Sequence, residues 1–404
     1  MKKDVAFFTI CNLQYLPKAL VLAKSLYETN SETMIIYVFD EEQEGIPLDE
    51  SYEIRWVKNE NIPNFAHIAF MYDVTEACTS VKPYLTIKLL DSYQKVIYLD
   101  PDICVYSSLS DLYSLLDSYP ILLTPHYTTP IEDATLEYDI GMMRWGSFNL
   151  GFYAVNDSEE ALRFLNWWSE RCIHLCFAET QFGLSTDQKW VSIAPCFFEN
   201  IKVLFDLGYN MAFWNLHERE LSCNEDMSYM VNNKYVLKFF HYSSFDIKNP
   251  TAISARPHQW NKVGREDLNT ICIDYAKRLK ENSVEVSKSK YAYNYMSNGD
   301  FISPVLRRAY VSVYKELDPH HDPFDTNGIV ARFMRKNNLR VKGDQPYKAL
   351  SESNLNSSYS WQFKLTNTGL RLLLRIVGPN MFSNFSRLLV FLSSYRKNRK
   401  LWKL

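Results

Sequence analysis

The chain has 404 residues, of which 47% are hydrophobic and 23% are charged, and its net charge is −3. This composition is typical of a globular protein long enough for one large α/β domain with additions. It excludes a dedicated nucleic-acid binder, which would be strongly basic.

Cysteine usage and hydropathy bear on the compartment. The eight cysteines show neither a C-x-x-C pair nor zinc-like spacing, which suits a reducing compartment. The first residues, Met1 to Asp4, enter a strand directly and show no cleavable signal pattern. No apolar stretch reaches the ~18–20 residues that a membrane-spanning helix needs. We therefore expect a cytoplasmic protein.

The first part of the chain alternates strand and helix patterns. Buried strands are predicted at 5–10, 34–39 and 52–57, and an apolar helical stripe begins at Leu16. This alternation predicts a parallel sheet with helices on its faces. Neither a G-x-G-x-x-G motif after the first strand nor a P-loop occurs, so a bound nucleotide would need a metal at its phosphates.

Two aspartates follow the best-defined strand. A helix from Lys82 leads into an unbroken apolar run at 96–99, which ends in Asp100-Pro101-Asp102. Proline stops the hydrogen-bond ladder, so both carboxylates should lie at the carboxyl edge of a central strand, where ligands bind in α/β sheets. Two hard oxygen ligands suit Mg²⁺ or Mn²⁺ that also binds substrate phosphates. The alternative interpretation is a solvated Asp-Pro turn.

The middle of the chain continues the pattern. Strands are predicted at 121–124 and 148–155, and a helix at 158–176. Gly151 inside a strand indicates that the backbone closely approaches another group there. Residues 126–146 are polar and irregular, and we expect a long functional loop that covers a substrate.

Polar and aromatic side chains cluster later in the chain. A final strand at 235–240 ends in His241, which is placed as Asp102 is and is a candidate third metal ligand; the alternative is a structural histidine. Trp214, Asn215 and His217 favour a sugar platform with hydrogen-bonding groups, or else a packed loop. The 27 Tyr, 24 Phe and 9 Trp residues also hint weakly at carbohydrate.

Five motifs in this order resemble the retaining enzymes of glycosyltransferase family 8 and related bacterial polysaccharide enzymes. They are T-I-C-N-L-Q-Y-L-P-K-A-L, Lys82, Y-L-D-P-D, F-N-L-G-F-Y-A-V-N, and S-T-D-Q followed by F-F-H-Y-S-S-F-D. The resemblance covers about residues 4–255. It implies a GT-A fold, Rossmann-like α/β, with a catalytic domain over 1–255. The helical, charged stretches that follow predict a helical extension over 256–352.

The resemblance also implies roles for individual residues. Asp100, Asp102 and His241 would hold Mn²⁺ or Mg²⁺ against the diphosphate of a nucleotide sugar, with a UDP-sugar favoured. The donor would contact Thr9, Asn12 and Tyr15 at its nucleoside, Lys82 and Lys248 at its phosphates, and Asn149, Asp187 and Gln188 at its sugar. Asp187 and Gln188 would be catalytic, with Gln188 on the reacting face. A saccharide or lipid-linked acceptor would contact Trp214, Asn215 and His217.

The sequence departs from the family pattern after the histidine. The family has H-x-x-G-x-x-K-P-W, whereas this chain has HYSSFDIKNP, with Ser244 in place of the glycine and Lys248 one position late. Two other functions stay open. One is a sugar nucleotidyltransferase, although CNLQYLPK lacks its phosphate loop, and the other is a non-enzymatic carbohydrate-binding protein on a transferase fold.

The C-terminal third differs in charge. His320-His321-Asp322-Pro323 resembles a metal motif, but we interpret it as a turn. From 353 to 404 there are nine basic residues and no acidic one, so the first 352 residues carry −12. Because Leu, Phe and Trp accompany these basic residues, we expect a peripheral tail that binds the inner leaflet of a membrane. A docking helix and a disordered basic tail are the alternatives.

Overall fold

The computed structural model describes residues 2–132, 136–224, 228–256, 264–318, 320–341 and 361–404. The chain divides into two compact units, one comprising Met1–Phe65 and Val74–Ala292, the other Ala66–Asp73 and Tyr293–Leu404. The first unit thus extends beyond the predicted boundary at residue 255. The reason is helix α10 (Asn269–Glu281), whose Tyr275 stacks on Tyr242 with ring centroids 3.7 Å apart.

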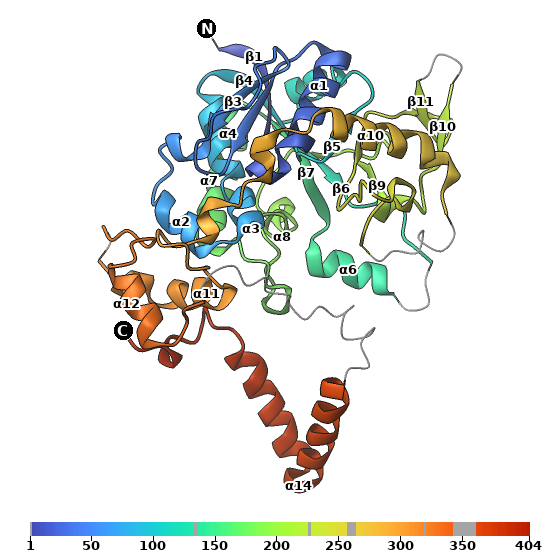
Figure 1. Cartoon of the computed structure of the whole chain (residues 1–404). Coiled ribbons are helices and arrows are strands. Elements are labelled where there is room, and N and C mark those ends of the chain that lie inside the picture. Colours follow the sequence, from blue (N-terminus) through green and yellow to red (C-terminus); the bar gives the residue numbers. More distant parts are fainter. Residues whose placement is uncertain (1, 133–135, 225–227, 257–263, 319, 342–360) are drawn as a thin grey trace. The chain divides into compact units, whose positions relative to one another are not determined.

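A seven-stranded sheet forms the centre of the first unit (Figure 1). In spatial order its strands are β3 (Tyr52–Trp56), β2 (Met34–Val38), β1 (Lys3–Cys11), β4 (Tyr93–Leu99), β7 (Phe148–Asn156), β6 (Ile121–Pro125) and β8 (Ile201–Val203). The strands from β3 to β4 are parallel, as predicted, but β7 runs antiparallel to both of its neighbours, so the sheet is mixed.

Alternating side chains fill the two faces of this sheet, because successive residues of a strand point to opposite sides. Ile97 and Leu99 belong to a core that includes apolar residues of α1 (Leu16–Asn30) and α5 (Asp111–Ser118). Tyr98 faces the other way and stacks on Tyr153, with ring centroids 5.2 Å apart. That second face is covered by α4 (Lys82–Leu90) and α7 (Glu159–Leu175), and Thr86 of α4 hydrogen-bonds the Tyr153 hydroxyl at 2.7 Å.

Two small sheets complete the strand structure of the first unit. One orders β5 (Ile103–Val105), β13 (Phe239–His241) and β9 (Met211–Ala212), and the other β10 (Leu221–Cys223), β11 (Tyr229–Val231) and β12 (Tyr235–Val236). The predicted single strand at 235–240 was therefore wrong. Its halves pair with different partners, which local β-propensity does not specify.

The segment 126–146 is not the irregular loop that its polarity predicted. It contains helix α6 (Glu137–Trp145), while residues 133–135 lie outside the described residues. Glu137 and Asp139 lie in the first turn and Arg144 in the last, an order that suits the helix dipole. Gly146, with φ of 122°, follows as the C-cap residue.

The second unit is helical and includes α2 (Phe65–Met71), α11 (Pro304–Val313) and α12 (Ile329–Lys336). Arg307 is buried, and its guanidinium donates to the carbonyls of Phe70 at 2.7 Å and Tyr72 at 2.6 Å, which satisfies the end of α2. In the expected turn after residue 319, Nε2 of His321 lies 3.2 Å from the Tyr310 hydroxyl.

Helix α14 (Trp361–Leu392) is interrupted at Gly378, which has φ of 75°, and Pro379. The break divides it into two arms, 361–377 and 379–392. No helix within the described ranges has both the length and the apolarity to cross a bilayer.

Candidate active site

The aspartate pair lies in the turn that joins β4 to β5. The Asp100 amide donates to the Gly151 carbonyl of β7 at 2.8 Å, and the Ile103 amide donates to the Asp100 carbonyl at 3.1 Å, which closes the turn. The Asp102 side chain is 11% exposed and that of Asp100 is 26% exposed. Both carboxylates thus lie at the carboxyl edge of β4, as the sequence predicted.

Strand pairing brings His241 to the same place. In the antiparallel β5–β13 pair His241 is opposite Ile103, directly after Asp102, and the Tyr242 amide donates to the Asp102 carbonyl at 2.8 Å. The His241 Nε2 atom lies 3.1 Å from Oδ1 of Asp102 and 3.8 Å from Oδ2 of Asp100. One ligand atom from each residue lies within 4.8 Å of the others. Two carboxylates and an imidazole form a donor set that fits Mn²⁺ or Mg²⁺.

Hydrogen bonds fix the orientation of the His241 ring. Nδ1 of His241 lies 3.2 Å from Oδ1 of the buried Asn210, which leaves Nε2 toward the carboxylates. The Asn210 amide in turn donates to Oδ1 of Asn149 and to Oγ1 of Thr124, both at 3.0 Å. Asn149, a predicted donor-sugar residue, therefore belongs to the layer that supports the histidine.

Gly151 makes room for this ring. A Cβ atom at residue 151 would lie 2.5 Å from Cε1 and 2.7 Å from Nδ1 of His241, closer than real Cβ atoms come. The close approach that the sequence predicted at Gly151 is thus an approach of β7 to the imidazole.

Lys82 links the aspartate pair to Asp187. Its buried Nζ lies 3.2 Å from a carboxylate oxygen of Asp100 and 3.2 Å from one of Asp187, donates to the Leu150 carbonyl at 2.9 Å, and lies over the Tyr98 ring. Burial by itself lowers the pKa of Lys82, but Asp100 and Asp187 outweigh it, so the pKa lies above its usual value. Lys82 is therefore a cation at neutral pH. Burial has the larger effect on Asp187 and raises the pKa of that carboxyl.

Two other groups lie at the aspartates, and no sequence motif marked them. Nζ of Lys18, on α1, lies 3.8 Å from Oδ2 of Asp102 and 4.1 Å from the centre of the Tyr15 ring. The Tyr98 hydroxyl donates to Asp100 at 2.6 Å. Burial raises the pKa of Asp102, but His241 and Lys18 more than offset this, and the pKa lies well below its usual value. Tyr98 could have been found from period-two alternation, since residues 98 and 100 share a face.

The catalytic candidates Asp187 and Gln188 lie at the start of α8 (Gln188–Val191). The Trp168 indole donates to the Asp187 carbonyl at 3.0 Å. The Gln188 side chain bridges two backbones, because it donates to the Trp145 carbonyl at 3.0 Å and accepts from the Leu150 amide at 3.4 Å. Gln188 thus joins α6 to β7 beside the aspartate turn.

The three predicted acceptor residues differ in their surroundings. The Trp214 ring meets His241 edge to face, with centroids 5.1 Å apart. Asn215 is fully buried, and its amide binds the Ala212 amide and the His126 and Asn210 carbonyls. His217 Nε2 lies 2.9 Å from the Thr129 carbonyl. Asn215 is therefore placed to support the loop.

His126 was not predicted and belongs to the same group. Its Nε2 lies 3.4 Å from the Asn149 amide nitrogen, and its ring packs edge to face with Trp214, with centroids 5.7 Å apart. Burial lowers the pKa of His126 to about 4, so the ring is neutral at pH 7. No motif marked this residue, which lies just after β6.

The remaining donor residues lie at the end of β1 and beyond β13. Thr9 and Asn12 are buried, whereas Tyr15 is 43% exposed. Lys248 is exposed, and among the described residues its side chain has no contact with the aspartates or His241.

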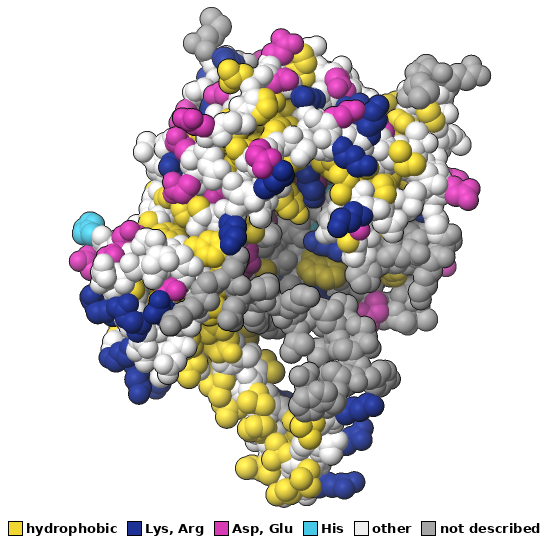
Figure 2. Space-filling model, in the orientation of Figure 1, with side chains coloured by type: hydrophobic (Ala, Val, Ile, Leu, Met, Phe, Trp, Pro, Cys, Tyr) yellow, Lys and Arg dark blue, Asp and Glu magenta, His cyan; other side chains and the backbone are white. Residues whose placement is uncertain are grey.

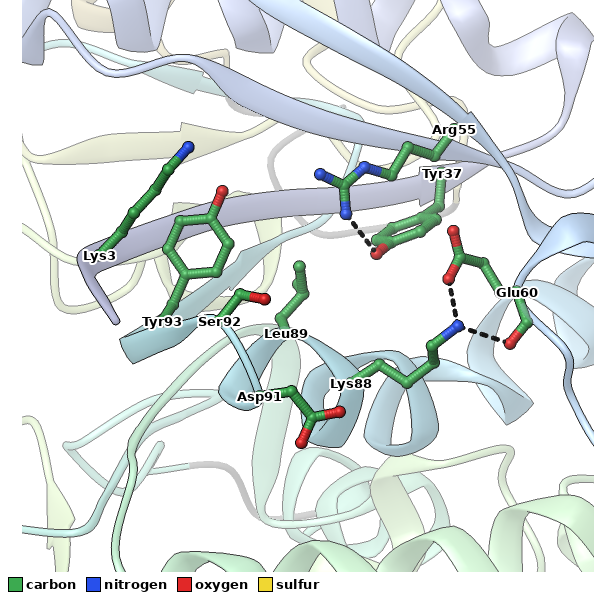
Figure 3. A pocket seen from close by; sticks show the side chains of 9 residues that line it. All are labelled: Lys3, Tyr37, Arg55, Glu60, Lys88, Leu89, Asp91, Ser92 and Tyr93. Atoms are coloured by element: carbon green, nitrogen blue, oxygen red, sulfur yellow. Dashed lines mark hydrogen bonds and ion pairs between the residues drawn. The ribbon is translucent and has the colours of Figure 1, made fainter. Parts of the chain in front are cut away.

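A separate pocket of about 440 Å³ lies near the start of β4, at Tyr93 (Figure 3). Three of its charged side chains bind groups in the wall of the pocket. Lys88 binds the Glu60 carboxylate at 2.6 Å, and Arg55 binds the Tyr37 hydroxyl at 3.4 Å. This pocket is therefore not a candidate for the active site.

Comparison with known proteins agrees with the sequence motifs. Residues 7–161 match the model of the family described as Glycosyl transferase family 8. This match agrees with the resemblance that the motifs in this part of the chain indicated. The match includes Lys82 and the aspartate pair, whereas Asp187, Gln188 and His241 lie beyond it.

Two curated relatives come from Bacillus subtilis (strain 168). The uncharacterized protein YfnD is 25% identical over 177 residues, which are 43% of this chain and 54% of that protein. The uncharacterized protein YfnF is 24% identical over 199 residues, 48% of this chain and 64% of that protein. The chain thus spans less than two thirds of the curated relatives that it matches.

Similar solved structures are glycosyltransferases. The galactosyltransferase LgtC, in complex with donor and acceptor sugar analogs, is 14% identical and has a TM-score of 0.40, covering 68% of this chain and 95% of that one. The glycosyltransferase GlyE of Streptococcus pneumoniae TIGR4 is 16% identical and has a TM-score of 0.37, and the match covers 69% of this chain and 63% of that one.

Proposed function

We propose that this protein is a metal-dependent glycosyltransferase that moves a sugar from a nucleotide-diphosphate donor, with a UDP-sugar favoured, to a saccharide or lipid-linked acceptor. The observation that carries the proposal is the convergence of Asp100, Asp102 and His241 within 4.8 Å beside a buried lysine. The two aspartates and the lysine lie inside the region that matches a glycosyltransferase family. We place its role in the synthesis of cell-surface polysaccharide or lipopolysaccharide.

The charges around the aspartate turn suit a diphosphate leaving group. Breaking a sugar–phosphate bond builds negative charge on the departing diphosphate, and a divalent cation held by Asp100, Asp102 and His241 would neutralise part of it. Lys18 lies 3.8 Å from Asp102 on the α1 side, where its ammonium group is placed to contact the same phosphates. Thr9, Asn12 and Tyr15 would then border the nucleoside.

The donor sugar would lie between the aspartate turn and α8. Asp187 is buried and held by Lys82 at 3.2 Å, so we assign it orientation and electrostatic support rather than covalent attack. Gln188 would face the reacting carbon, and with it we propose that the anomeric configuration is retained. Because Asn149 supports His241 through Asn210, its effect on the sugar would be indirect.

The acceptor would approach from the Trp214 side. The indole lies against His241 and His126, and the neutral His126 ring offers a hydrogen-bonding group beside it. Helix α6 comes after His126 in the chain, and Gln188 donates to the carbonyl of its last residue, Trp145. We propose that this helix excludes water from the sugar. Within the described part of the chain the Lys248 side chain has no contact that supports a direct role, and we leave it at the margin of the donor site.

The cysteines support a reducing compartment for this reaction. None of the eight, all of which lie in the described ranges, forms a disulfide, and five of them are buried. We propose that the transfer takes place in the cytoplasm.

Removal of one ligand tests the function. In Asp102→Asn, which keeps the shape of the side chain, transfer from a UDP-sugar should fall at least about a hundredfold, and Mn²⁺-dependent thermal stabilisation by UDP should disappear. Asp117→Asn, which removes a surface carboxylate 2.8 Å from Lys95, should change neither. Near-normal transfer by a folded Asp102→Asn protein would refute the proposal. A screen of nucleotide sugars with and without Mn²⁺ would identify the donor.

A further inference from the structure

The arms of α14 expose many apolar side chains. Leu365, Leu372 and Ile376 of the first arm are 64%, 57% and 73% exposed, at spacings of seven and four residues that place them on one face. In the second arm Met381, Phe385, Leu388 and Leu392 recur at spacings of four, three and four. Figure 2 shows hydrophobic side chains along this helix down to its turn. A soluble chain seldom exposes so continuous an apolar surface unless something binds it.

A basic stripe runs beside the apolar face of the first arm. Lys364, Arg371 and Arg375 follow the same spacings of seven and four residues, one position before the apolar set, so they form a parallel stripe about 100° around the helix. In the second arm Arg387, Ser383 and Ser386 lie on the side away from the apolar face, and that side also carries the exposed Val390 and Phe391. From residue 353 to the end of the chain there is no acidic side chain. The charge of this surface suits anionic headgroups.

The residues that follow α14 bind other parts of the second unit. Arg399 donates to Glu316 at 2.8 Å, and Lys403 and Asn337 exchange hydrogen bonds of 2.7 and 2.8 Å. Trp402 is 8% exposed. At 1.5 Å per residue the arms are roughly 25 and 21 Å long, shorter than the ~30 Å hydrocarbon core of a bilayer. The two arms meet at a turn and form a helical hairpin, the α14 hairpin (Figure 1).

We propose that the α14 hairpin is a monotopic membrane anchor that lies flat in the headgroup region of an anionic bilayer. The apolar faces of both arms enter the outermost acyl region, and the basic stripe lies among the lipid phosphates. Insertion with the Gly378 turn leading is disfavoured, because it would carry Arg371 and Arg375 into hydrocarbon. This inference does not rest on the proposed glycosyl transfer. The sequence predicted a membrane-binding tail over residues 353–404, and the proposal assigns the binding to the α14 hairpin within it.

Vesicle binding by the full-length protein tests the anchor. The protein should sediment with vesicles of phosphatidylglycerol and phosphatidylcholine and not with pure phosphatidylcholine. Arg371→Gln with Arg375→Gln should weaken binding about 25-fold, at roughly fivefold per charge. Leu372→Ser with Ile376→Ser should reduce it to background. A matched control, Lys277→Gln with Lys280→Gln on the exposed surface of α10, removes the same charge elsewhere and should bind as the wild type does.

Several results would overturn the proposal. Equal losses in the α14 and α10 charge variants would mean that only net charge matters. Equal binding to neutral and anionic vesicles would mean that the protein does not recognise an anionic surface. If the wild type ignores vesicles but forms a dimer that Leu372→Ser with Ile376→Ser dissociates, the hairpin binds a second copy instead. Failure to bind vesicles as a monomer would equally refute the anchor. Thermal denaturation of each variant establishes that it is folded.

Discussion

Gly151→Ala should damage the candidate metal site while leaving every ligand in place. The new Cβ would lie 2.5 Å from Cε1 of His241, whereas ordinary contacts begin near 3.4 Å, so the ring or the strand must move by about 0.9 Å. Metal–ligand distances tolerate only ~0.2 Å. We expect Mn²⁺ affinity to fall roughly 10–100-fold, as when supporting residues of metal sites are changed, and stability to fall by about 1–3 kcal/mol from overpacking.

The assay is calorimetric titration of Mn²⁺ in the presence of UDP, together with urea denaturation. Gly369→Ala is the matched control, because a Cβ there meets nothing within 4 Å, and it should leave Mn²⁺ affinity unchanged. The double variant Gly151→Ala with His241→Ala identifies the cause. Two of the three closest atoms belong to the imidazole, so most of the stability cost of Gly151→Ala should vanish once that ring is removed.

Unchanged Mn²⁺ affinity in Gly151→Ala would refute the reasoning, since the imidazole would then not be a ligand in the orientation that Asn210 gives it. An equal stability cost with and without the imidazole would assign the strain to Asn149 or to the strand itself.

Three further predictions concern charged groups. Lys82→Met should lower the free energy of unfolding, measured by urea denaturation, by about 3–5 kcal/mol, because Asp187 stays buried without its cation. Lys82→Met with Asp187→Leu should recover most of this stability. No recovery would refute the pairing of Lys82 with Asp187. Glu218→Gln should cost about 3 kcal/mol at pH 7 by leaving the buried Arg219 unpaired. Burial raises the pKa of Glu218, but Arg219 and backbone donors hold the pKa below its usual value. The stability that the ionised Glu218 contributes is therefore present above pH ~4.3 and is lost as the pH falls through the folded pKa. A stability difference between Glu218→Gln and the wild type that persists in acid would contradict this. Lys18→Gln should weaken UDP binding with Mn²⁺ about tenfold in calorimetry, with partial rescue by Lys18→Arg; unaltered affinity would exclude contact with the phosphates.

The sequence located most accurately those site residues that follow the end of a predicted strand. Asp100, Asp102 and His241 all follow apolar runs, and strand ends gather at one edge of a sheet. Their meeting nevertheless depends on the short β5–β13 pair, which the sequence did not reveal, because only three residues of each strand take part. The prediction succeeded through position along the strand rather than through knowledge of the partner.

Supporting residues were harder to find because they depend on side-chain direction and on contacts distant in sequence. Asn210 reaches His241 across 31 residues, and Lys18 reaches Asp102 across 84. Neither belongs to a spacing that indicates a ligand. Helix α6 was missed for a different reason: its polar sequence resembles a loop, and its capping charges at Glu137 and Arg144 are a weak local signal.

The charges at the site explain why a cation and a diphosphate would bind together. Asp100, Asp102 and Asp187 are three carboxylates, and Lys82 and Lys18 are two ammonium groups within 3.8 Å of them. The charges of these three carboxylates and two ammonium groups sum to −1, which repels a diphosphate. A divalent cation changes the sum to +1, so phosphates would be attracted only after the cation is bound. We therefore expect ordered binding, in which the affinity for UDP is negligible in the absence of Mn²⁺. If Lys82 and Lys18 alone attracted phosphate, UDP would bind without Mn²⁺.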